Sequence, residues 1–358
     1  MVTGTVERRP ERGLSFWIRQ STPWSIGIAA SGAAALALVF VGPAAVLTLH
    51  GLVPVDSLVE GFKSSELRAV TLAACALGLV ALVLGAASYR RMPTKASREG
   101  ALAGSVLGTQ ALALGVFLLW FAGGDVETFA INYLNFEIIE PQLDDFLTGA
   151  KNTVFLAFVG EALGVVLGLV ISVFAVSSRA VVRAPARAYI NFFRATPLIW
   201  QLIFIGVGLP IGLRLDISTY QAALIALSLN TAAYAAEVFR AGIQSIERGQ
   251  LEAARGLGMS YAQAMRYAVI PQALRRVIPP LMNEFVILIK DTSLVLVLGL
   301  TAEQRDLMTV GDQAVANTFN ASFYIATAIG YLAIILPLIR VVNVLERRLR
   351  SGLVGVGA

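Results

Sequence analysis

Charged residues are scarce in this sequence. Asp, Glu, Lys and Arg make up 14% of the 358 residues, against about 25% in an average soluble domain. The scarcity is concentrated, because four stretches contain no charged residue at all: 21–55, 69–89, 101–124 and 217–236. Each is as long as the ~20 residues that a helix needs to cross a ~30 Å hydrocarbon core. With 57% apolar residues, the composition excludes a soluble globular protein and predicts an all-α membrane protein.

Cysteine and histidine are almost absent, with one residue of each: Cys75 and His50. A single cysteine excludes an intrachain disulfide and argues against a metal cluster. A single histidine excludes a multi-histidine metal site. The chain also lacks the G-x-x-x-x-G-K-[ST] pattern of a phosphate-binding loop. We therefore expect no metal and no cofactor on this chain.

Hydropathy predicts eight transmembrane spans. In chain order they lie at about 24–49, 69–88, 101–122, 153–178, 195–213, 218–238, 277–300 and 322–345. The first is too long and too far from a small-residue cleavage site for a signal peptide, so we interpret it as a retained helix.

The positions of Lys and Arg predict the orientation. If the amino terminus is cytoplasmic, 22 of the 28 basic residues fall in cytoplasmic segments, as the positive-inside rule requires. Both termini are then cytoplasmic. Arg194, at the inner end of the fifth span, is interpreted as a topology anchor, with a gate or a partner contact as the alternative. The net charge of +5 thus reflects topology and does not indicate nucleic acid.

The acidic outer loop at about 123–152 is the natural boundary within the chain. We predict an N-terminal extension of three spans over residues 1–145, in which no span contains an ionisable residue. A second domain of five spans follows over 146–350. All four intramembrane charges fall in this second domain.

Those four charges are Glu161, Glu284, Lys290 and Asp291. Each costs ~2.5–3.5 kcal/mol near the bilayer centre, so each should face protein or water. One interpretation is structural: Lys290 and Asp291 form a mutual pair, and Glu161 is a protonated, hydrogen-bonded acid. The other is a polar substrate path, to which four neutral side chains add hydrogen bonds: Asn230, Thr231, Tyr234 and Asn283. On a regular helix Lys290 and Asp291 point about 100° apart, so a simple pair is not assured.

The cytoplasmic segment 239–276 mixes apolar and charged residues at helical spacing. Gly256 and Gly258 separate two predicted short helices, where a turn with positive φ would fit. Ser260 and Gln263 have the spacing of a capping box, and Pro271 limits how far the second helix continues unkinked. An interfacial hairpin lying on the lipid surface is an alternative.

One string in this segment resembles a known family. Glu252, Ala253 and Ala254, then Gly258, then Ile270 and Pro271 resemble the EAA loop of permease subunits of binding-protein-dependent ATP-binding-cassette importers. Ala268 stands where the family has a larger hydrophobic residue. Further strings resemble the polar-amino-acid branch of the family, at 192–202, 230–246 and 289–294. The resemblance covers about 146–350.

The resemblance implies a type I importer permease core of five helices in an amino-acid importer of the bacterial cell (inner) membrane. It also implies that the chain is not itself an enzyme. Its partners would be two cytoplasmic ATPase subunits that bind ATP and Mg²⁺, a second identical or homologous permease subunit, and an extracytoplasmic amino-acid-binding protein. ATPase coupling would run through Glu252, Ala253, Ala254, Arg255, Gly258 and Pro271.

Two other hypotheses remain open at this point. The first is an ion-coupled secondary transporter that uses Glu161, Glu284 and Asp291 as a relay. The second is a membrane anchor or sensor that transports nothing.

Overall fold

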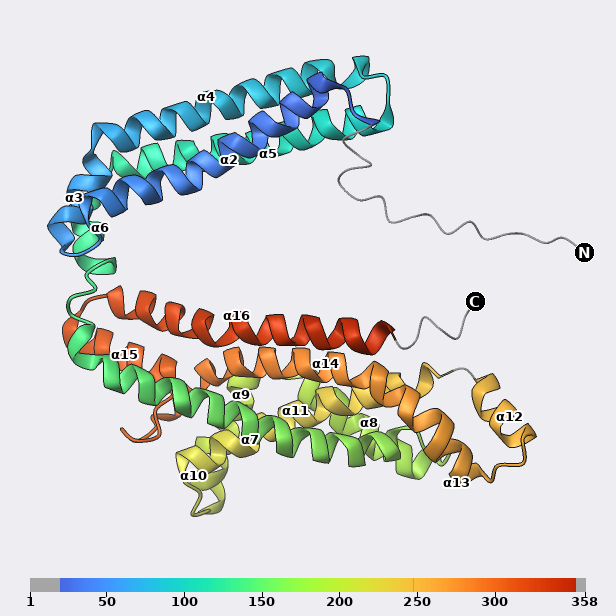
Figure 1. The fold of residues 1–358 in the computed structure, drawn as a ribbon. Coiled ribbons are helices and arrows are strands. Elements are labelled where there is room, and N and C mark those ends of the chain that lie inside the picture. The colour runs from blue at the N-terminus through green and yellow to red at the C-terminus, as the bar shows by residue number, and fades with distance from the viewer. Residues whose placement is uncertain (1–19, 247, 352–358) are drawn as a thin grey trace, which may run out of the picture. The chain divides into compact units, whose positions relative to one another are not determined.

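The computed structural model describes residues 20–246 and 248–351 and divides the chain into two compact units, Met1–Ile138 and Ile139–Ala358 (Figure 1). The division falls a few residues before the boundary expected at 145. Every regular element in the described ranges is helical.

The first unit contains three long helices, α2 (Pro23–His50), α4 (Ser65–Ser88) and α5 (Lys95–Ala122). Each begins at a Ser or Thr whose hydroxyl accepts a backbone N–H three residues on: Thr22, Ser64 and Thr94. These caps satisfy N–H groups that the first helical turn leaves without partners. Two short helices, α3 (Val55–Lys63) and α6 (Val126–Tyr133), pack against each other.

Small residues let the three long helices approach closely. A Cβ atom added at Gly104 of α5 would lie 2.4 Å from the carbonyl oxygen of Ile28 in α2. One added at Gly108 would lie 2.4 Å from the carbonyl oxygen of Gly78 in α4. Such contact between helix backbones is the usual basis of association in membranes, where lipid tails remove the hydrophobic drive. Cys75 is buried at the same α4–α5 interface, facing Gly115.

The second unit begins with η2 (Glu140–Gln142) and the 33-residue helix α7 (Leu143–Ala175). The elements that follow are α8 (Ala180–Ala195), α9 (Leu198–Ile203), η3 (Phe204–Gly208), α10 (Leu209–Leu213), α11 (Thr219–Gln244), α12 (Arg248–Gly256), α13 (Tyr261–Ala264), η4 (Met265–Val269), α14 (Ile270–Asp291), η5 (Thr292–Leu298), α15 (Leu307–Thr318) and α16 (Ser322–Ser351). The π-helical turns are η3 and η4, and η5 is a 3₁₀ helix.

The core of the second unit lies where α7 and α11 meet. A Cβ atom added at Gly164 of α7 would lie 2.5 Å from the Cβ of Thr231, and one at Gly168 would lie 2.7 Å from the Cβ of Ala235. Leu156, Leu227 and Ile289 are buried beside this contact. Gly160 and Gly164 flank Glu161 in α7, and α11 is the helix that approaches them closely.

The predicted count of eight spans is not confirmed by helix length and composition. Six helices in the described ranges are long and apolar enough to cross a membrane, and α8 with α9–α10 makes a seventh if a pair bent by 105° is one span. The predicted span at 277–300 differs most. The α14 helix begins at Ile270, carries Arg275, Arg276, Glu284, Lys290 and Asp291, and passes into a 3₁₀ helix at Thr292. Its charges keep it below the apolarity of the other spans.

Both π-helical turns precede a proline. Pro210 lies in the first turn of α10, directly after η3, and Pro271 lies in the first turn of α14, directly after η4. Proline donates no backbone N–H and clashes with the carbonyl four residues earlier. A π turn changes the hydrogen-bond register at that point. The helical path therefore continues through Pro271, which the sequence predicted would limit how far the second helix continues unkinked.

Candidate transport cavity and coupling segment

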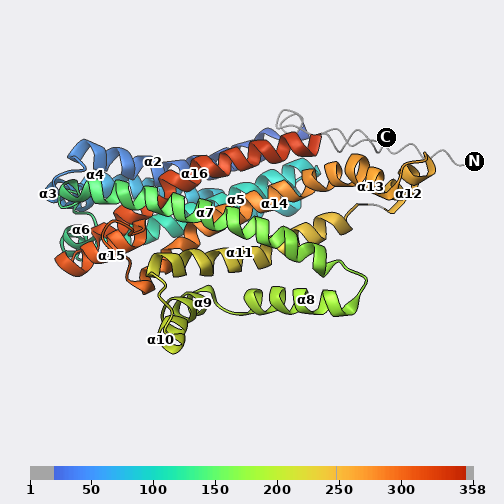
Figure 2. The ribbon, with the colours of Figure 1, turned by 90° about the horizontal axis from the view of Figure 1, so that it is seen from below.

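The bend between α8 and α9 is held by a buried amide. Figure 2 shows α8 lying beside α11 and the chain turning away at α9 and α10. The Gln201 side chain, 1% exposed, donates from Nε2 to the carbonyl oxygens of Phe193 and Thr196, at 2.9 and 3.1 Å. Asn230 of α11 donates to Oε1 of Gln201 at 3.1 Å. These bonds satisfy carbonyls that the helix end leaves free and tie the bend to α11.

A cavity of about 540 Å³ lies beside this bend. Five of the predicted path residues line it: Asn230, Thr231, Tyr234, Glu284 and Asp291. Glu284 and Asp291 lie on one face of α14 because seven residues span nearly two turns. The volume is within the usual ~300–1,000 Å³ of small-molecule sites.

Arg194 also lines this cavity, which a role as a topology anchor alone does not predict. Its guanidinium carbon lies 5.3 Å from the centre of the Tyr234 ring, in cation–π geometry. The predicted fifth span begins at residue 195, so Arg194 is expected just outside it at the cytoplasmic end. In the structure the 16-residue helix α8 packs against α11 before the bend. This path places Arg194, near the end of α8, at the cavity.

A second cavity of about 460 Å³ lies between α14 and α16, toward the end of the unit that carries α12. Asn283 lines it together with Arg275, Arg276 and Glu346. Glu284 lines both cavities. The two spaces therefore adjoin at this carboxylate.

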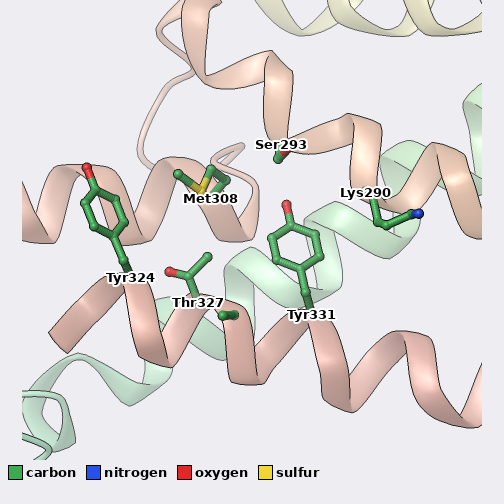
Figure 3. A pocket seen from close by; sticks show the side chains of 7 residues that line it. Lys290, Ser293, Met308, Tyr324, Thr327 and Tyr331 are labelled. Carbon is green, nitrogen blue, oxygen red and sulfur yellow. The ribbon is translucent and has the colours of Figure 1, made fainter. Parts of the chain in front are cut away.

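Lys290 points into a different cavity from its neighbour Asp291. It lines a space of about 420 Å³ with Ser293, Tyr324 and Tyr331, and Figure 3 shows its ammonium group pointing away from the tyrosines. Lys290 and Asp291 are not among the ion pairs of the described residues. The mutual pair considered from the sequence does not form, and the 100° between adjacent helix positions explains the separation.

Glu161 lies apart from the other predicted path residues. It lines an apolar space of about 330 Å³ between α7 and α14. Neither carboxylate oxygen has a hydrogen-bond partner among the described residues. The hydrogen-bonded acid considered from the sequence is therefore not what the structure shows.

The predicted coupling segment forms two short helices with a turn between them. Gly258 has a φ of +85°, and Ser260 and Gln263 form a complete capping box, as the sequence predicted. Ala254 is buried, and a small apolar cluster of Ile246, Val269 and Ala273 lies beside α12.

The other predicted coupling residues lie on the surface: Glu252, Ala253, Arg255, Gly258 and Pro271. Leu257 is 81% exposed beside them, and Tyr261 and Tyr267 are also exposed.

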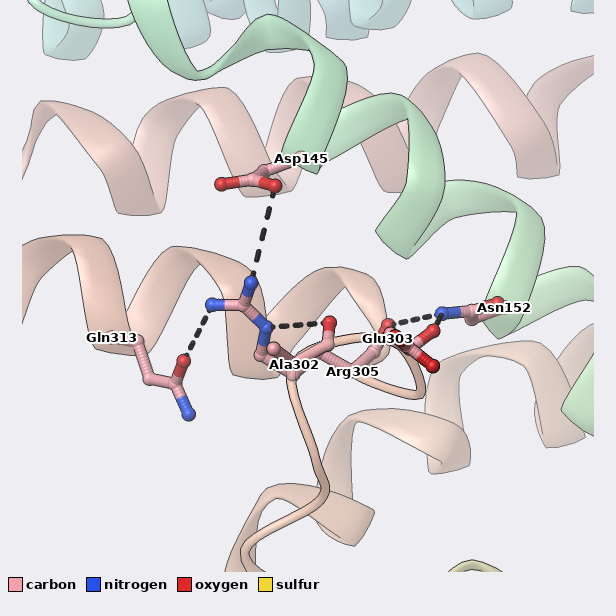
Figure 4. Close-up of polar contacts among 6 residues, drawn as sticks. All are labelled: Asp145, Asn152, Ala302, Glu303, Arg305 and Gln313. Carbon is pink, nitrogen blue, oxygen red and sulfur yellow. Dashed lines mark hydrogen bonds and ion pairs between the residues drawn. The ribbon is translucent and has the colours of Figure 1, made fainter.

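At the opposite end of α14, the chain between η5 and α15 is tied to α7 (Figure 4). Arg305 lies 3.9 Å from Asp145 and donates to Gln313 at 2.7 Å, and Asn152 donates to the carbonyl of Glu303 at 2.9 Å.

Asp306 is fully buried beside this group of residues. It caps α15 by accepting from the backbone N–H of Met308 and Thr309. These bonds satisfy N–H groups in the first turn of α15, and the N–H of Leu307 donates to the hydroxyl of Thr153 in α7 at 2.9 Å.

These features define a class of protein: a helical membrane protein with a charged cavity inside its bundle and an exposed segment of two short helices at one end. The profile of one family, "Binding-protein-dependent transport system inner membrane component", matches residues 164–351. The chain belongs to this family and is therefore a permease subunit of an ATP-binding-cassette importer, not an enzyme.

Named relatives agree with this assignment. The "Arginine transport system permease protein ArtQ" of Bacillus subtilis (strain 168) is 36% identical over 219 residues, covering 61% of this chain and 98% of that protein. The "Glutamine transport system permease protein GlnP" of Escherichia coli (strain K12) is 36% identical over 214 residues, covering 59% of this chain and 96% of that protein.

Solved structures share the fold. An amino acid ABC transporter crystallised with histidines is 37% identical, with a TM-score of 0.56, and the match covers 60% of this chain and 98% of that one. An inward-facing MetNI methionine ABC transporter, at 20% identity and a TM-score of 0.51 over 59% of this chain and 98% of that one, shares the fold. The second unit thus has the type I importer permease fold. An ion-coupled secondary transporter is not supported.

Proposed function

We propose that this chain forms the translocation path of an amino-acid importer in a bacterial cell (inner) membrane, with both termini cytoplasmic. Relatives named for arginine and glutamine transport support the substrate class. The observation that carries the proposal is the cavity beside α8, because it offers Glu284 and Asp291 to an ammonium group and Asn230 and Tyr234 as neutral hydrogen-bonding groups.

The route toward the cytoplasm passes Glu284. This carboxylate lines both the cavity beside the α8–α9 bend, called the central cavity from here on, and the second cavity, which lies toward α12. A substrate ammonium group that leaves the first cavity therefore keeps a carboxylate partner while it moves, which limits the cost of desolvation. Asn283 then lies on the exit side. Glu161 and Lys290 line other spaces and have no place in this route.

Energy comes from partners, in this proposal two cytoplasmic ATPase subunits that bind ATP and Mg²⁺. A second permease subunit, identical or homologous, and an extracytoplasmic amino-acid-binding protein complete the complex in the lipid bilayer. The α12 segment is the docking element: Glu252 and Arg255 offer charges, and Leu257 offers an exposed apolar side chain. Motion of α12 reaches α14 through η4, because the helical path is continuous from Tyr261 to Asp291.

The first test is uptake by proteoliposomes that contain the permease, its ATPase and its binding protein. We expect ATP-dependent uptake of L-arginine or L-glutamine that survives collapse of the proton gradient. Uptake that needs the proton gradient and proceeds without ATP would overturn the proposal.

Coupling is tested at Gly258. Its φ of +85° costs an L-amino acid roughly 1–2 kcal/mol, so Gly258→Ala should distort the turn. We expect uptake to fall several-fold while ATP hydrolysis continues. Gly249→Ala is the control, because Gly249 lies in α12 with no atom within 4 Å of an added Cβ. Equal uptake by the two variants would contradict the coupling role.

A further inference from the structure

Glu161 is a buried acid that the proposed route does not use. Both of its carboxylate oxygens are buried, and neither has a hydrogen-bond partner among the described residues. Glu161 is also in none of the ion pairs of this part of the chain. A buried polar group without a partner is costly, and more so when it is charged. This carboxylate would therefore gain much from a hydrogen-bond donor that arrives from outside the chain.

The packing of α7 sets the direction of this side chain. Gly160 faces α11, where an added Cβ would lie 3.4 Å from the Cβ of Leu227. Adjacent positions on a helix point about 100° apart. Glu161 therefore projects to the side of this contact, into the space between α7 and α14.

That space is a pocket of about 330 Å³, at the lower end of the usual ~300–1,000 Å³ of small-molecule sites. Its other lining side chains are all apolar, and they include the rings of Phe158 and Phe285 and the thioether of Met282. None of the lining residues in the described ranges is basic. One carboxylate thus stands in an otherwise apolar pocket.

This lining favours one kind of ligand. Apolar walls favour an apolar body, and a carboxylate binds a charged donor about twice as strongly as a neutral one. Aromatic rings in the wall also favour a cation. An amino acid does not fit, because its own carboxylate would be buried without a donor. The matching ligand is an amphiphilic amine.

The surface around the pocket suits entry from the bilayer. Phe155, Phe158, Leu163 and Val166 of α7 are 54–66% exposed. An exposed apolar surface on a membrane-spanning helix suits contact with acyl chains. A ligand dissolved in the lipid can therefore reach the pocket without passing through the central cavity.

We propose that this pocket binds a membrane-soluble amine, with the ammonium group on Glu161 and an apolar body between α7 and α14. The site is separate from the substrate path and does not depend on the substrate class. Its occupant contacts both helices, and α14 also carries Glu284 and Asp291. Binding would therefore hold one wall of the central cavity against α7.

The test measures binding of 4-phenylbutylamine to the purified permease–ATPase complex in phosphatidylcholine nanodiscs, after partition into empty nanodiscs is subtracted. Its counterpart, 4-phenyl-1-butanol, has the same apolar body and a neutral donor. We expect saturable binding of the amine, roughly 10- to 100-fold tighter than that of the alcohol. Equal binding of the two compounds, or no saturable binding of the amine, would overturn the proposal. The second result would follow if a partner subunit covers the pocket.

Three variants locate the binding. Glu161→Gln keeps the size of the side chain and should weaken the amine by a similar factor, with little effect on the alcohol. Ala162→Phe places a ring in the pocket and should abolish binding of both compounds. The matched control is Leu163→Phe, the next residue of α7 and outside the lining, which should change neither. Unchanged amine binding by Glu161→Gln would place the amine elsewhere, and equal losses in Ala162→Phe and Leu163→Phe would refute the pocket.

Discussion

A close backbone contact in the first unit leads to a quantitative prediction for Gly108→Ala. The added Cβ would lie 2.4 Å from the carbonyl oxygen of Gly78, where ordinary contacts begin near 3.4 Å. Helices α4 and α5 must then separate by about 1 Å, and such overpacking costs roughly 1–3 kcal/mol. The matched control is Gly27→Ala in α2, where an added Cβ meets no atom within 4 Å. The gain in helix propensity is similar in both variants, so their difference isolates the steric cost.

The chain contains its own reporter for this prediction. Cys75 is the single cysteine and is buried at the α4–α5 interface. Maleimide should modify Cys75 only when helices α4 and α5 separate. If the helices close again faster than the reagent reacts, the labelling rate is proportional to the equilibrium constant for opening. We expect Gly108→Ala to label roughly 5- to 150-fold faster than Gly27→Ala, the range that 1–3 kcal/mol corresponds to. Equal labelling rates would refute the packing argument.

Three further predictions concern the second unit. Gln201→Leu removes the hydrogen bonds that hold the α8–α9 bend and should cost about 1–3 kcal/mol, seen as a lower melting temperature; an unchanged one would show that the amide is dispensable. Asp306→Ala removes the cap of α15 and should cost about 0.5–2 kcal/mol, with faster proteolysis between η5 and α15 as the readout. Asp145→Asn should change the melting temperature hardly at all, because its contact with Arg305 spans 3.9 Å and its side chain is 58% exposed; a loss of several degrees would contradict this.

Much of the fold could be predicted because charge-free runs are a direct consequence of burial in lipid. The four runs largely coincide with α2, α4, α5 and α11. Hydropathy could not predict the 105° bend, because Pro197 marks a helix start but not the direction of the next helix. It also placed the start of the fourth span ten residues late, because α7 begins at polar residues that include Asp144 and Asp145. Acidic side chains favour a first turn, where the helix dipole is positive.

The candidate site could also be predicted only in part from the sequence. Glu284 and Asp291 are seven residues apart and share a face. This spacing is visible in the sequence, but the hypothesis of a pair between Lys290 and Asp291 did not use it. Arg194 could not be assigned to the cavity from the sequence, because its depth depends on the path of α8 beside α11. Glu161 and Lys290 were grouped with the path because hydropathy reports depth in the membrane and not direction around a helix.

The π turn at Met265–Val269 bears on how this segment tolerates changes in length. A π turn holds one residue more than an α-helical turn needs. After the deletion of a single residue, the turn can therefore close as a regular α-helical turn. Residues beyond the turn then keep their direction around the helix axis, and Glu284 and Asp291 stay on the cavity wall. A one-residue deletion in the regular part of α14 before Glu284 would instead rotate both carboxylates by about 100°, so the π turn is a place where a shorter chain presents the same face of α14 to its substrate.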